Sequence, residues 1–516
     1  MIRMTAAQAA ALVRTDDTLL IGGSGIGHAV PDALMAALGT RYRETGQPRD
    51  LTVLHPVGLG DGKARGMGHL AQDGLLKRVV TGTYVDCPTE ARMALDEKFE
   101  AYSMPQGVMS ELMREMAAGR PGLITKVGLH TFVDPRLGGG RQNRRATEDL
   151  IENVQIRGEE YLLYKPFHVD VVFVRGSAAD EDGNISMEHE AVTLEMLSMA
   201  QAARRCGGLV VAQVKRIVPR GSLHPKMVKV PGVLVDVLVV DPNQWQTYLT
   251  EDSPAYSGHL RVNLSDIPRL AAGPRRVIAR RDAMELFEGA ICNLGSGVST
   301  GLANVAAEEG VLTRVCLTNE QGNIGGAPSN KEPGAASSPD AQIDQPYQFD
   351  FYDGGGLDLA FLSFAEFDAA GNVNVSRFGG RLVGPGGFIN ISQGAHKVMF
   401  GGTLTANGAA KAVAQVEQIT FSGPYARECR QEILYVTERA VFRLGPEGPE
   451  LIEIAPGADL EADVLGVMGF RPSISPDLKR MDAALFGDGP MGLANRLPPH
   501  PPRAALARLQ GAGTAA

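Results

Sequence analysis

The sequence predicts an α/β protein built from two related open domains with largely parallel sheets, and three observations lead to this prediction. Short β-branched runs alternate with helical stretches, and the runs that read as strands are 18–21, 51–54, 171–174, 209–214, 235–240 and 314–317. The 516 residues include 62 glycines, many in Gly-Gly or Gly-x-Gly pairs, which indicates many tight turns. Two sequence features also recur in the same order in both halves. Strands that alternate with helices favour a parallel sheet, because parallel strands need crossover connections.

The helices between these strands have recognisable ends. Residues 32–42 carry a periodic set of apolar residues behind Pro31, and residues 190–205 stop at Gly207, a residue type that commonly ends helices. Residues 5–13 resemble a signal-peptide core, but Gln8 interrupts the run and acidic residues follow it. We therefore expect a short helix there.

The recurring features predict an internal duplication. Gly22-Gly23-Ser24-Gly25 and Leu294-Gly295-Ser296-Gly297 each precede a helix, and each is followed later by an Asp-x-x-Gly-Asn turn, at Asp180 to Asn184 and Asp368 to Asn372. We expect an N-terminal domain at 1–265 with the larger insertion around 104–164, a C-terminal domain at 275–490, and a Pro- and Ala-rich mobile tail at 497–516.

Composition excludes several classes of function. The net charge is −9 with a pI near 5.7 and no long Lys/Arg run, so nucleic acid is not an expected partner. The sequence contains no run of 18 apolar residues, so it does not predict a membrane span. The five cysteines are scattered and lack metal-ligand spacing, as in reduced cytoplasmic proteins. We expect a cytoplasmic protein without disulfides or zinc.

The most informative segment is Thr318-Asn319-Glu320-Gln321-Gly322, where a strand ends in one acid and opens into a glycine-rich loop. Ligands of open α/β sheets bind beyond the carboxyl ends of the strands, so a carboxylate there can touch a substrate. A helix cap or a solvated loop acid is the alternative reading of Glu320.

Two glycine-rich segments could bind an anion. Gly384-Pro385-Gly386-Gly387-Phe388 can present adjacent backbone N–H groups to an oxyanion, or serve only as a tight loop. The turn 295–301 opens a helix and could attract phosphate or carboxylate.

The turn 295–301 leaves two other enzyme classes open. It contains a Gly-x-Ser-x-Gly pattern around Ser299, with His396 as a possible base, which a serine hydrolase would use. A turn in which Ser299 or Thr300 caps the helix is the plainer reading. A dinucleotide-dependent oxidoreductase could bind NAD with the same turn and with Glu320, although Thr300 stands where the fingerprint needs glycine.

Together, Asn319-Glu320-Gln321-Gly322, Ile324-Gly325-Gly326 and 384–388 resemble the class I coenzyme A transferases. Further blocks at 122–128, 131–136, 175–180 and 349–358 are similar to the fused-chain acetate/propionate branch, also called acyl-CoA:acetate CoA-transferases, so the resemblance covers about residues 5–485. The sequence departs from the succinyl branch, which has Ser-Glu-Asn-Gly around the acid, and it carries charge at Lys331-Glu332-Pro333. These departures bear on acyl specificity.

The resemblance implies specific roles for residues. Glu320 matches the glutamate nucleophile that forms a 5-glutamyl-CoA thioester, and Gly387 matches the backbone oxyanion hole. The positions implied in CoA or substrate binding are Gly295, Gly297, Val298, Gly386 and Phe388.

The resemblance further implies ping-pong transfer of CoA between short-chain carboxylic acids, including 3-oxo acids, with CoA and acyl-CoA as substrates and with no cofactor or metal. It implies a homo-oligomer. A non-catalytic acyl-CoA-binding or acyl-carrier subunit of the same fold remains the alternative.

Overall fold

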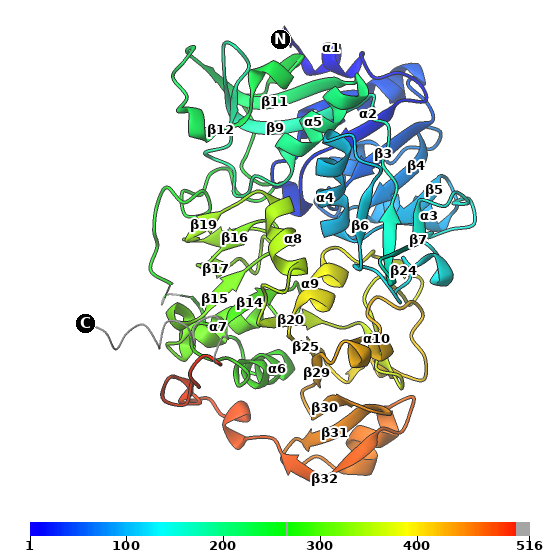
Figure 1. Cartoon of the computed structure of the whole chain (residues 1–516). Helices are drawn as coiled ribbons and strands as arrows, with labels where there is room; N and C mark the ends of the chain where they lie inside the picture. Colours follow the sequence, from blue (N-terminus) through cyan, green and yellow to red (C-terminus); the bar gives the residue numbers. More distant parts are fainter. Residues whose placement is uncertain (265–266, 502–516) are drawn as a thin grey trace.

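The computed structural model describes residues 1–264 and 267–501 of the chain. Residue 265, the predicted end of the first domain, and residues 502–516 of the predicted tail lie outside this range. Figure 1 shows the N-terminal half in the upper part of the molecule and the C-terminal half below it.

The N-terminal half is organised around an extended parallel sheet. Its strands run in the order β1-β13-β11-β9-β2-β3-β4-β5, and every neighbouring pair in this row is parallel. The strands are β1 Ile2–Met4, β2 Thr18–Ile21, β3 Leu51–His55, β4 Leu76–Thr81, β5 Glu100–Ser103, β9 Val171–Asp180, β11 Leu209–Val218 and β13 Val237–Val240, with β10 Ile185–Ser186 and β12 Val228–Val230 paired at the side. The helices are α1 Ala6–Ala10, α2 Asp32–Thr45, α3 Pro88–Leu95, α4 Gln106–Ala117 and α5 Met196–Cys206.

The predicted insertion at 104–164 contains α4 and a separate antiparallel sheet in the order β6-β8-β7. These strands are β6 Leu123–Thr125, β7 Ile151–Ile156 and β8 Glu159–Tyr164. The insertion packs on the main core, since Leu162 and Tyr164 of β8 are fully buried in the same cluster as Leu112 of α4.

The C-terminal half has a second large sheet in the order β19-β16-β15-β14-β20-β25-β29-β30-β31-β32, whose central strands β15 to β29 are parallel. Its strands are β14 Ile291–Leu294, β15 Cys316–Thr318, β16 Asn323–Ile324, β19 Ala341–Gln342, β20 Leu359–Ser363, β25 Lys397–Gly401, β29 Glu432–Val436, β30 Ala440–Gly445, β31 Gly448–Ile454 and β32 Ser473–Arg480. Its helices are α6 Pro274–Ala283, α7 Gly301–Glu308, α8 Gln345–Asp353, α9 Phe388–Gly394 and α10 Gly423–Glu428. Short hairpin strands complete this half: β17 Ala327–Pro328, β18 Ala336–Ser337, β21 Glu366–Asp368, β22 Val373–Asn374, β23 Arg377–Phe378, β24 Arg381–Leu382, β26 Thr405–Ala406, β27 Ala409–Ala410 and β28 Ala412–Val413.

The two sheets repeat one topology. The order β11-β9-β2-β3 in the first sheet corresponds to β25-β20-β14-β15 in the second, so each glycine-rich turn follows the equivalent strand, β2 or β14. The later Asp-x-x-Gly-Asn turns are also alike. Asp180 Oδ1 accepts the amides of Asp182 and Asn184, and Asp368 Oδ1 accepts those of Ala370 and Asn372. This agreement supports the predicted duplication, while the domain bounds at 1–265 and 275–490 stay a prediction.

The predicted fold class is confirmed, but some element bounds were wrong. The helix predicted at 190–205 begins only at Met196, because Glu190 is held in a buried ion pair with Arg175 and Leu194 has a φ of 54°. Strands β9 and β11 extend to Asp180 and Val218, well beyond the predicted ends. The strand predicted at 314–317 starts at Cys316, after a single 3-10 turn.

The carboxyl edges of the two sheets face each other across the domain interface. Gly82, which follows β4, accepts a hydrogen bond from the Gly386 amide at 2.8 Å. Helix α4 contacts α8 and α9, and the Gly107 amide donates to Asn390 Oδ1 at 3.1 Å. Figure 1 shows these three helices at the middle of the molecule. Loops that follow strands of both sheets therefore meet at one place.

Three further properties of the described residues bear on function. No helix among them combines the length and apolar composition that crossing a bilayer requires. Within the same residues, no three His, Cys, Asp or Glu side chains gather as metal ligands would. All five cysteines are free thiols.

The duplicated turns provide a stability test. Gly183 and Gly371 both have a φ of 85°, so alanine at either position costs about 1 kcal/mol in backbone strain. A Cβ at Gly371 would also collide with Leu444, whereas at Gly183 its nearest neighbour would be the Met1 side chain, at 3.3 Å. We expect Gly371→Ala to lower the free energy of unfolding by a further ~1–3 kcal/mol relative to Gly183→Ala. Guanidinium unfolding of the two variants measures this difference, and equal midpoints would contradict it.

Candidate active site

Glu320 lies just beyond the carboxyl end of β15, in a tight loop that returns as β16. The Asn319 amide donates to the Asn323 carbonyl at 3.1 Å, and the Asn319 side chain donates to the Gly334 carbonyl at 3.0 Å. Gly322 has a φ of 110° and packs directly on the Ile343 carbonyl, where no side chain would fit. The loop is thus fixed on both sides of the acid.

A buried polar floor lies at the base of this loop. Thr318 Oγ1 is 2.6 Å from the hydroxyl of Tyr352, and the Asn293 side chain donates to the same hydroxyl at 3.2 Å. All three side chains are almost completely buried. They come from β15, α8 and β14, so three elements determine the surroundings of Glu320.

Burial raises the pKa of the Glu320 carboxyl above its ordinary value, because the charged form loses water. Hydrogen bonds from Gln321 and Asn293 oppose this rise, the former at 3.3 Å from Glu320 Oε1. No Lys, Arg or His of the described residues forms an ion pair with Glu320. The Glu320 side chain is half-buried, so the site holds a partly desolvated carboxylate without a cationic partner among the described residues.

Gly387 lies directly against this acid. A Cβ at Gly387 would stand 3.2 Å from Glu320 Cγ and 3.4 Å from Phe349 Cζ, so the missing side chain makes the close approach possible. The Gly387 amide donates to no acceptor among the described residues, whereas the Gly386 and Phe388 amides donate to the carbonyls of Gly82 and Pro385. One free backbone N–H therefore belongs to the residue that touches Glu320.

The remaining predicted binding residues occupy two places. The ring of Phe388 is buried and stacks on Phe400 at 5.6 Å, so its side chain serves the core. Gly295 and Val298 follow β14, the strand beside β15, and their amides donate to the Phe361 carbonyl and to Ser363 Oγ. Gly297 is exposed, with a φ of 93°. The turn thus lies at the same sheet edge as Glu320.

The serine-hydrolase arrangement is not assembled. The Ser299 hydroxyl lies 3.2 Å from that of Ser363. His396 immediately precedes β25, at the amino edge of the sheet, whereas Ser299 follows the carboxyl end of β14. The two residues are therefore at opposite edges of parallel strands, and the hydrolase alternative was wrong.

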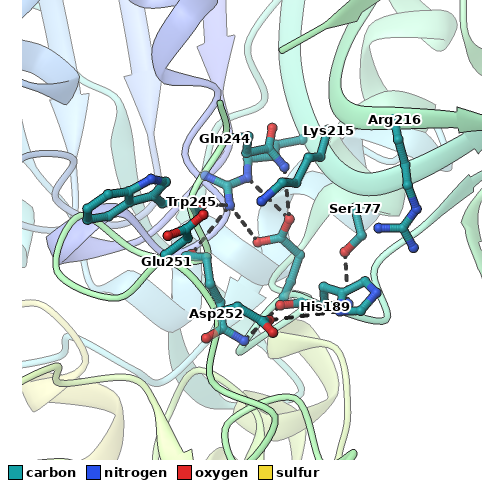
Figure 2. A pocket seen from close by; sticks show the side chains of 11 residues that line it. Ser177, His189, Lys215, Arg216, Gln244, Trp245, Glu251 and Asp252 are labelled. Carbon is teal, nitrogen blue, oxygen red and sulfur yellow. Dashed lines mark hydrogen bonds and ion pairs between the residues drawn. The ribbon is translucent and has the colours of Figure 1, made fainter. Parts of the chain in front are cut away.

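A cavity of about 360 Å³ lies elsewhere, at the carboxyl ends of β9 and β11 (Figure 2). It is lined by Arg175, Ser177, His189, Glu190, Lys215, Arg216, Gln244, Trp245, Gln246, Glu251 and Asp252. None of the predicted site residues belongs to its wall. Figure 2 shows the segment from Gln244 to Asp252 closing one side of the cavity.

Sequence reasoning missed the residues that surround Glu320. Asn293 and Tyr352 come from segments distant in sequence, and both are buried. A buried asparagine within the apolar run of β14 was the one available signal, because a polar side chain in a core strand needs a partner.

Comparison with known proteins decides the family. A family model described as Coenzyme A transferase matches residues 3–241. The chain is 44% identical to a caffeate CoA-transferase of Acetobacterium woodii over 510 residues, with 94% of this chain and 97% of the relative covered. The chain belongs to the coenzyme A transferase family.

Further relatives support the assignment of this chain to the coenzyme A transferase family. The acetate CoA-transferase YdiF of Escherichia coli strain K12 is 41% identical, with 95% of this chain and 96% of the relative covered. A crystal structure of YdiF from E. coli O157:H7, described as a thioester complex with CoA, has a TM-score of 0.91 and 40% identity, and covers 96% of this chain and 98% of that one. A putative citrate lyase alpha subunit from Streptococcus mutans, 12% identical with a TM-score of 0.51 over 86% of this chain and 79% of that chain, shares the fold alone.

These findings confirm the predicted enzyme class. The protein is a CoA-transferase, and the ping-pong route through an enzyme–CoA thioester fits the thioester complex described for YdiF. The oxidoreductase and the non-catalytic alternatives are thereby set aside.

The contact between Gly387 and Glu320 can be tested directly. The φ of Gly387 is −79°, so Gly387→Ala introduces no backbone strain, but its Cβ would crowd Glu320 and Ile391. Alanine keeps the backbone N–H, but its Cβ would displace the Glu320 side chain from it. We therefore expect normal thermal stability and a loss in kcat/KM of up to about 10²–10³, the range for losing one oxyanion donor. Steady-state kinetics and a thermal melt of the same preparation check this. Full activity would contradict the close approach.

Proposed function

We propose that Glu320 is the nucleophile of this CoA-transferase and that the Gly387 amide stabilises the oxyanion. The observation that carries the proposal is the placement of a half-buried carboxylate with a raised pKa, without a cationic partner, against a glycine whose N–H is free. The resemblance of 319–322 and 384–388 to the family motifs supports the same assignment.

The first half of the reaction forms a covalent enzyme. A Glu320 oxygen attacks the acyl thioester carbonyl, the C–S bond breaks, and an acyl-glutamyl anhydride and CoA thiolate result. The thiolate then attacks the glutamyl carbonyl, which releases the first carboxylate and leaves a glutamyl-CoA thioester. An incoming carboxylate reverses the two steps and departs as the new acyl-CoA.

The difficulty lies in expelling thiolate rather than carboxylate from the first tetrahedral intermediate. The reference pKa values of a thiol and of Glu differ by about four units, equivalent to about 6 kcal/mol. Burial reduces this gap, because it raises the pKa of Glu320 and makes its carboxylate a poorer leaving group. An oxyanion donor such as the Gly387 amide contributes on the order of 3 kcal/mol. Binding energy from the remote part of CoA can supply more.

We propose short-chain carboxylic acids as the substrates, with acetate as one of them. The names of two similar proteins, an acetate and a caffeate CoA-transferase, support carboxylic acids of differing size. A panel of short acids, 3-oxo acids and aromatic acids as CoA acceptors would rank them. Failure of every short acid would remove this part of the proposal.

We also propose that the enzyme needs no cofactor or metal, interacts with neither nucleic acid nor membrane, and works in the cytoplasm as a homo-oligomer. The first point rests on the mechanism, in which one carboxylate and one backbone amide suffice. Dialysis against a chelator tests it, and light scattering of the purified protein tests the assembly.

The covalent role of Glu320 predicts a specific adduct. Wild-type enzyme incubated with acetyl-CoA and no acceptor should gain the mass of one CoA less one water, and borohydride should convert the Glu320 side chain to an alcohol. Glu320→Ala should abolish both the adduct and transfer while the protein stays folded, because a strand-end acid adds little to the core. An adduct at another residue, or retained turnover, would remove Glu320 from the mechanism.

The raised pKa of Glu320 predicts the pH profile. The attacking form is the carboxylate, so adduct formation should fall as the pH drops through the pKa of Glu320 in the free enzyme. Since burial raises this pKa, the acid limb of kcat/KM for acyl-CoA should lie above the ordinary value of 4.5. Stopped-flow measurements of CoA release across the acid range check this. A limb at or below 4.5 would contradict the desolvated site.

A further inference from the structure

Glu332 is a buried carboxylate whose hydrogen-bond donors among the described residues are side-chain hydroxyl groups. It lies in the loop 329–334 between the short strands β17 and β18, and only 4% of its surface is exposed. Its neighbour Lys331 is exposed. No Lys, Arg or His of the described residues forms an ion pair with Glu332. A buried carboxylate of this kind needs several donors to offset its lost hydration.

The donors all come from the N-terminal half. Thr247 donates to Glu332 Oε1, and the hydroxyls of Thr250 and Tyr256 donate to Oε2 at 3.0 and 2.9 Å. The loop is further organised by Ser329, whose Oγ accepts the Glu332 amide at 3.1 Å and lies 3.3 Å from the Tyr256 hydroxyl. We call residues 244–256, which carry these donors, the strap.

The strap is firmly attached to the first sheet. Arg175 of β9 donates to the carbonyls of Trp245 and Gln246, and its guanidinium pairs with Glu190 at 3.0 Å. The Tyr248 amide also donates to the Ile26 carbonyl at 2.8 Å. Glu332 therefore binds a rigid part of the N-terminal half.

The two residues after Glu332 contact His28 and the loop that carries Glu320. The Pro333 carbonyl lies 3.0 Å from Nε2 of the buried His28, whose pKa burial lowers to about 4, so the ring is neutral and donates its Nε2–H. The Gly334 carbonyl accepts the side-chain amides of Asn319 and Asn323, at 3.0 and 2.8 Å. Asn319 directly precedes Glu320. A Cβ on Gly334 would also stand 3.4 Å from the side chain of Gln321.

We propose that Glu332 is a positioning residue. Its hydrogen bonds hold the loop 329–334 of the C-terminal half against the strap and thereby keep water away from the Glu320 site. The inference rests on the proposed role of Glu320. The acyl-glutamyl anhydride and the glutamyl-CoA thioester both hydrolyse if water reaches them, so transfer requires a closed site. Glu332 joins the two halves beside that site through bonds that cross the domain interface.

The test compares hydrolysis with transfer. Glu332→Ala leaves three hydroxyls without their acceptor and frees Pro333 and Gly334, whereas Glu332→Gln keeps one acceptor oxygen. We expect the ratio of acyl-CoA hydrolysis to CoA transfer to rise about tenfold or more in Glu332→Ala and less in Glu332→Gln. The CoA adduct at Glu320 should still form in both variants and should decay faster in water. A role confined to stability would lower the melting temperature without moving this ratio in the folded enzyme.

Two further variants make the outcome decisive. Lys331→Ala changes the exposed neighbour in the same loop and should leave the ratio and the adduct lifetime at wild-type values. Tyr256→Phe removes one donor from the strap side and should shift both quantities in the direction of Glu332→Gln, so it decides the matter if Glu332→Ala does not fold. Wild-type ratios and adduct lifetimes in folded Glu332→Gln and Tyr256→Phe would overturn the inference. Absence of any adduct in the wild-type enzyme would instead refute the role of Glu320.

Discussion

The close contact between the Glu320 side chain and Gly387 is the constraint on which the rest of the site depends. A carboxylate at a strand end would ordinarily be solvated, yet here the loop 384–388 lies so close that a Cβ at Gly387 would stand 3.2 Å from its Cγ. Only glycine leaves room for this, and the same residue contributes a free N–H. The partial desolvation of Glu320 and the nearness of the proposed oxyanion donor therefore both depend on this close approach.

That contact requires the carboxyl edges of two sheets to meet. The Gly386 amide binds the carbonyl of Gly82 from the first sheet, and Gln106 of α4 returns a bond to the Gly386 carbonyl. The duplication explains why this is possible, because both halves present their glycine-rich turns at equivalent strand ends. In the proposed mechanism the second half keeps the acid and the first half supplies the opposing wall.

The proposed mechanism passes through an anhydride that water would hydrolyse, so the site must also exclude water. The molecule contains buried polar contacts between its halves beside the Glu320 loop, and among the described residues Glu332 is a buried carboxylate in these contacts that forms no ion pair. Hydroxyl donors suit this position, since they hydrogen-bond to the carboxylate without placing a positive charge near Glu320. A cation there would lower the pKa of Glu320 and favour the form that leaves most easily.

The sequence by itself determined the α/β class, the duplication and the location of Glu320 after a strand, because these are local patterns of periodicity, glycine spacing and strand ends. It also gave reasons to single out Gly387, although not for its contact with Glu320. Strand lengths and the late start of α5 could not be foreseen, since the Arg175–Glu190 pair that displaces the helix start joins residues on different elements. Only the tertiary structure placed Asn293, Tyr352 and Thr318 under the acid and the strap hydroxyls on Glu332. The physical reason is that desolvation and hydrogen bonding act between side chains far apart in the chain, and no local pattern records which of them will meet.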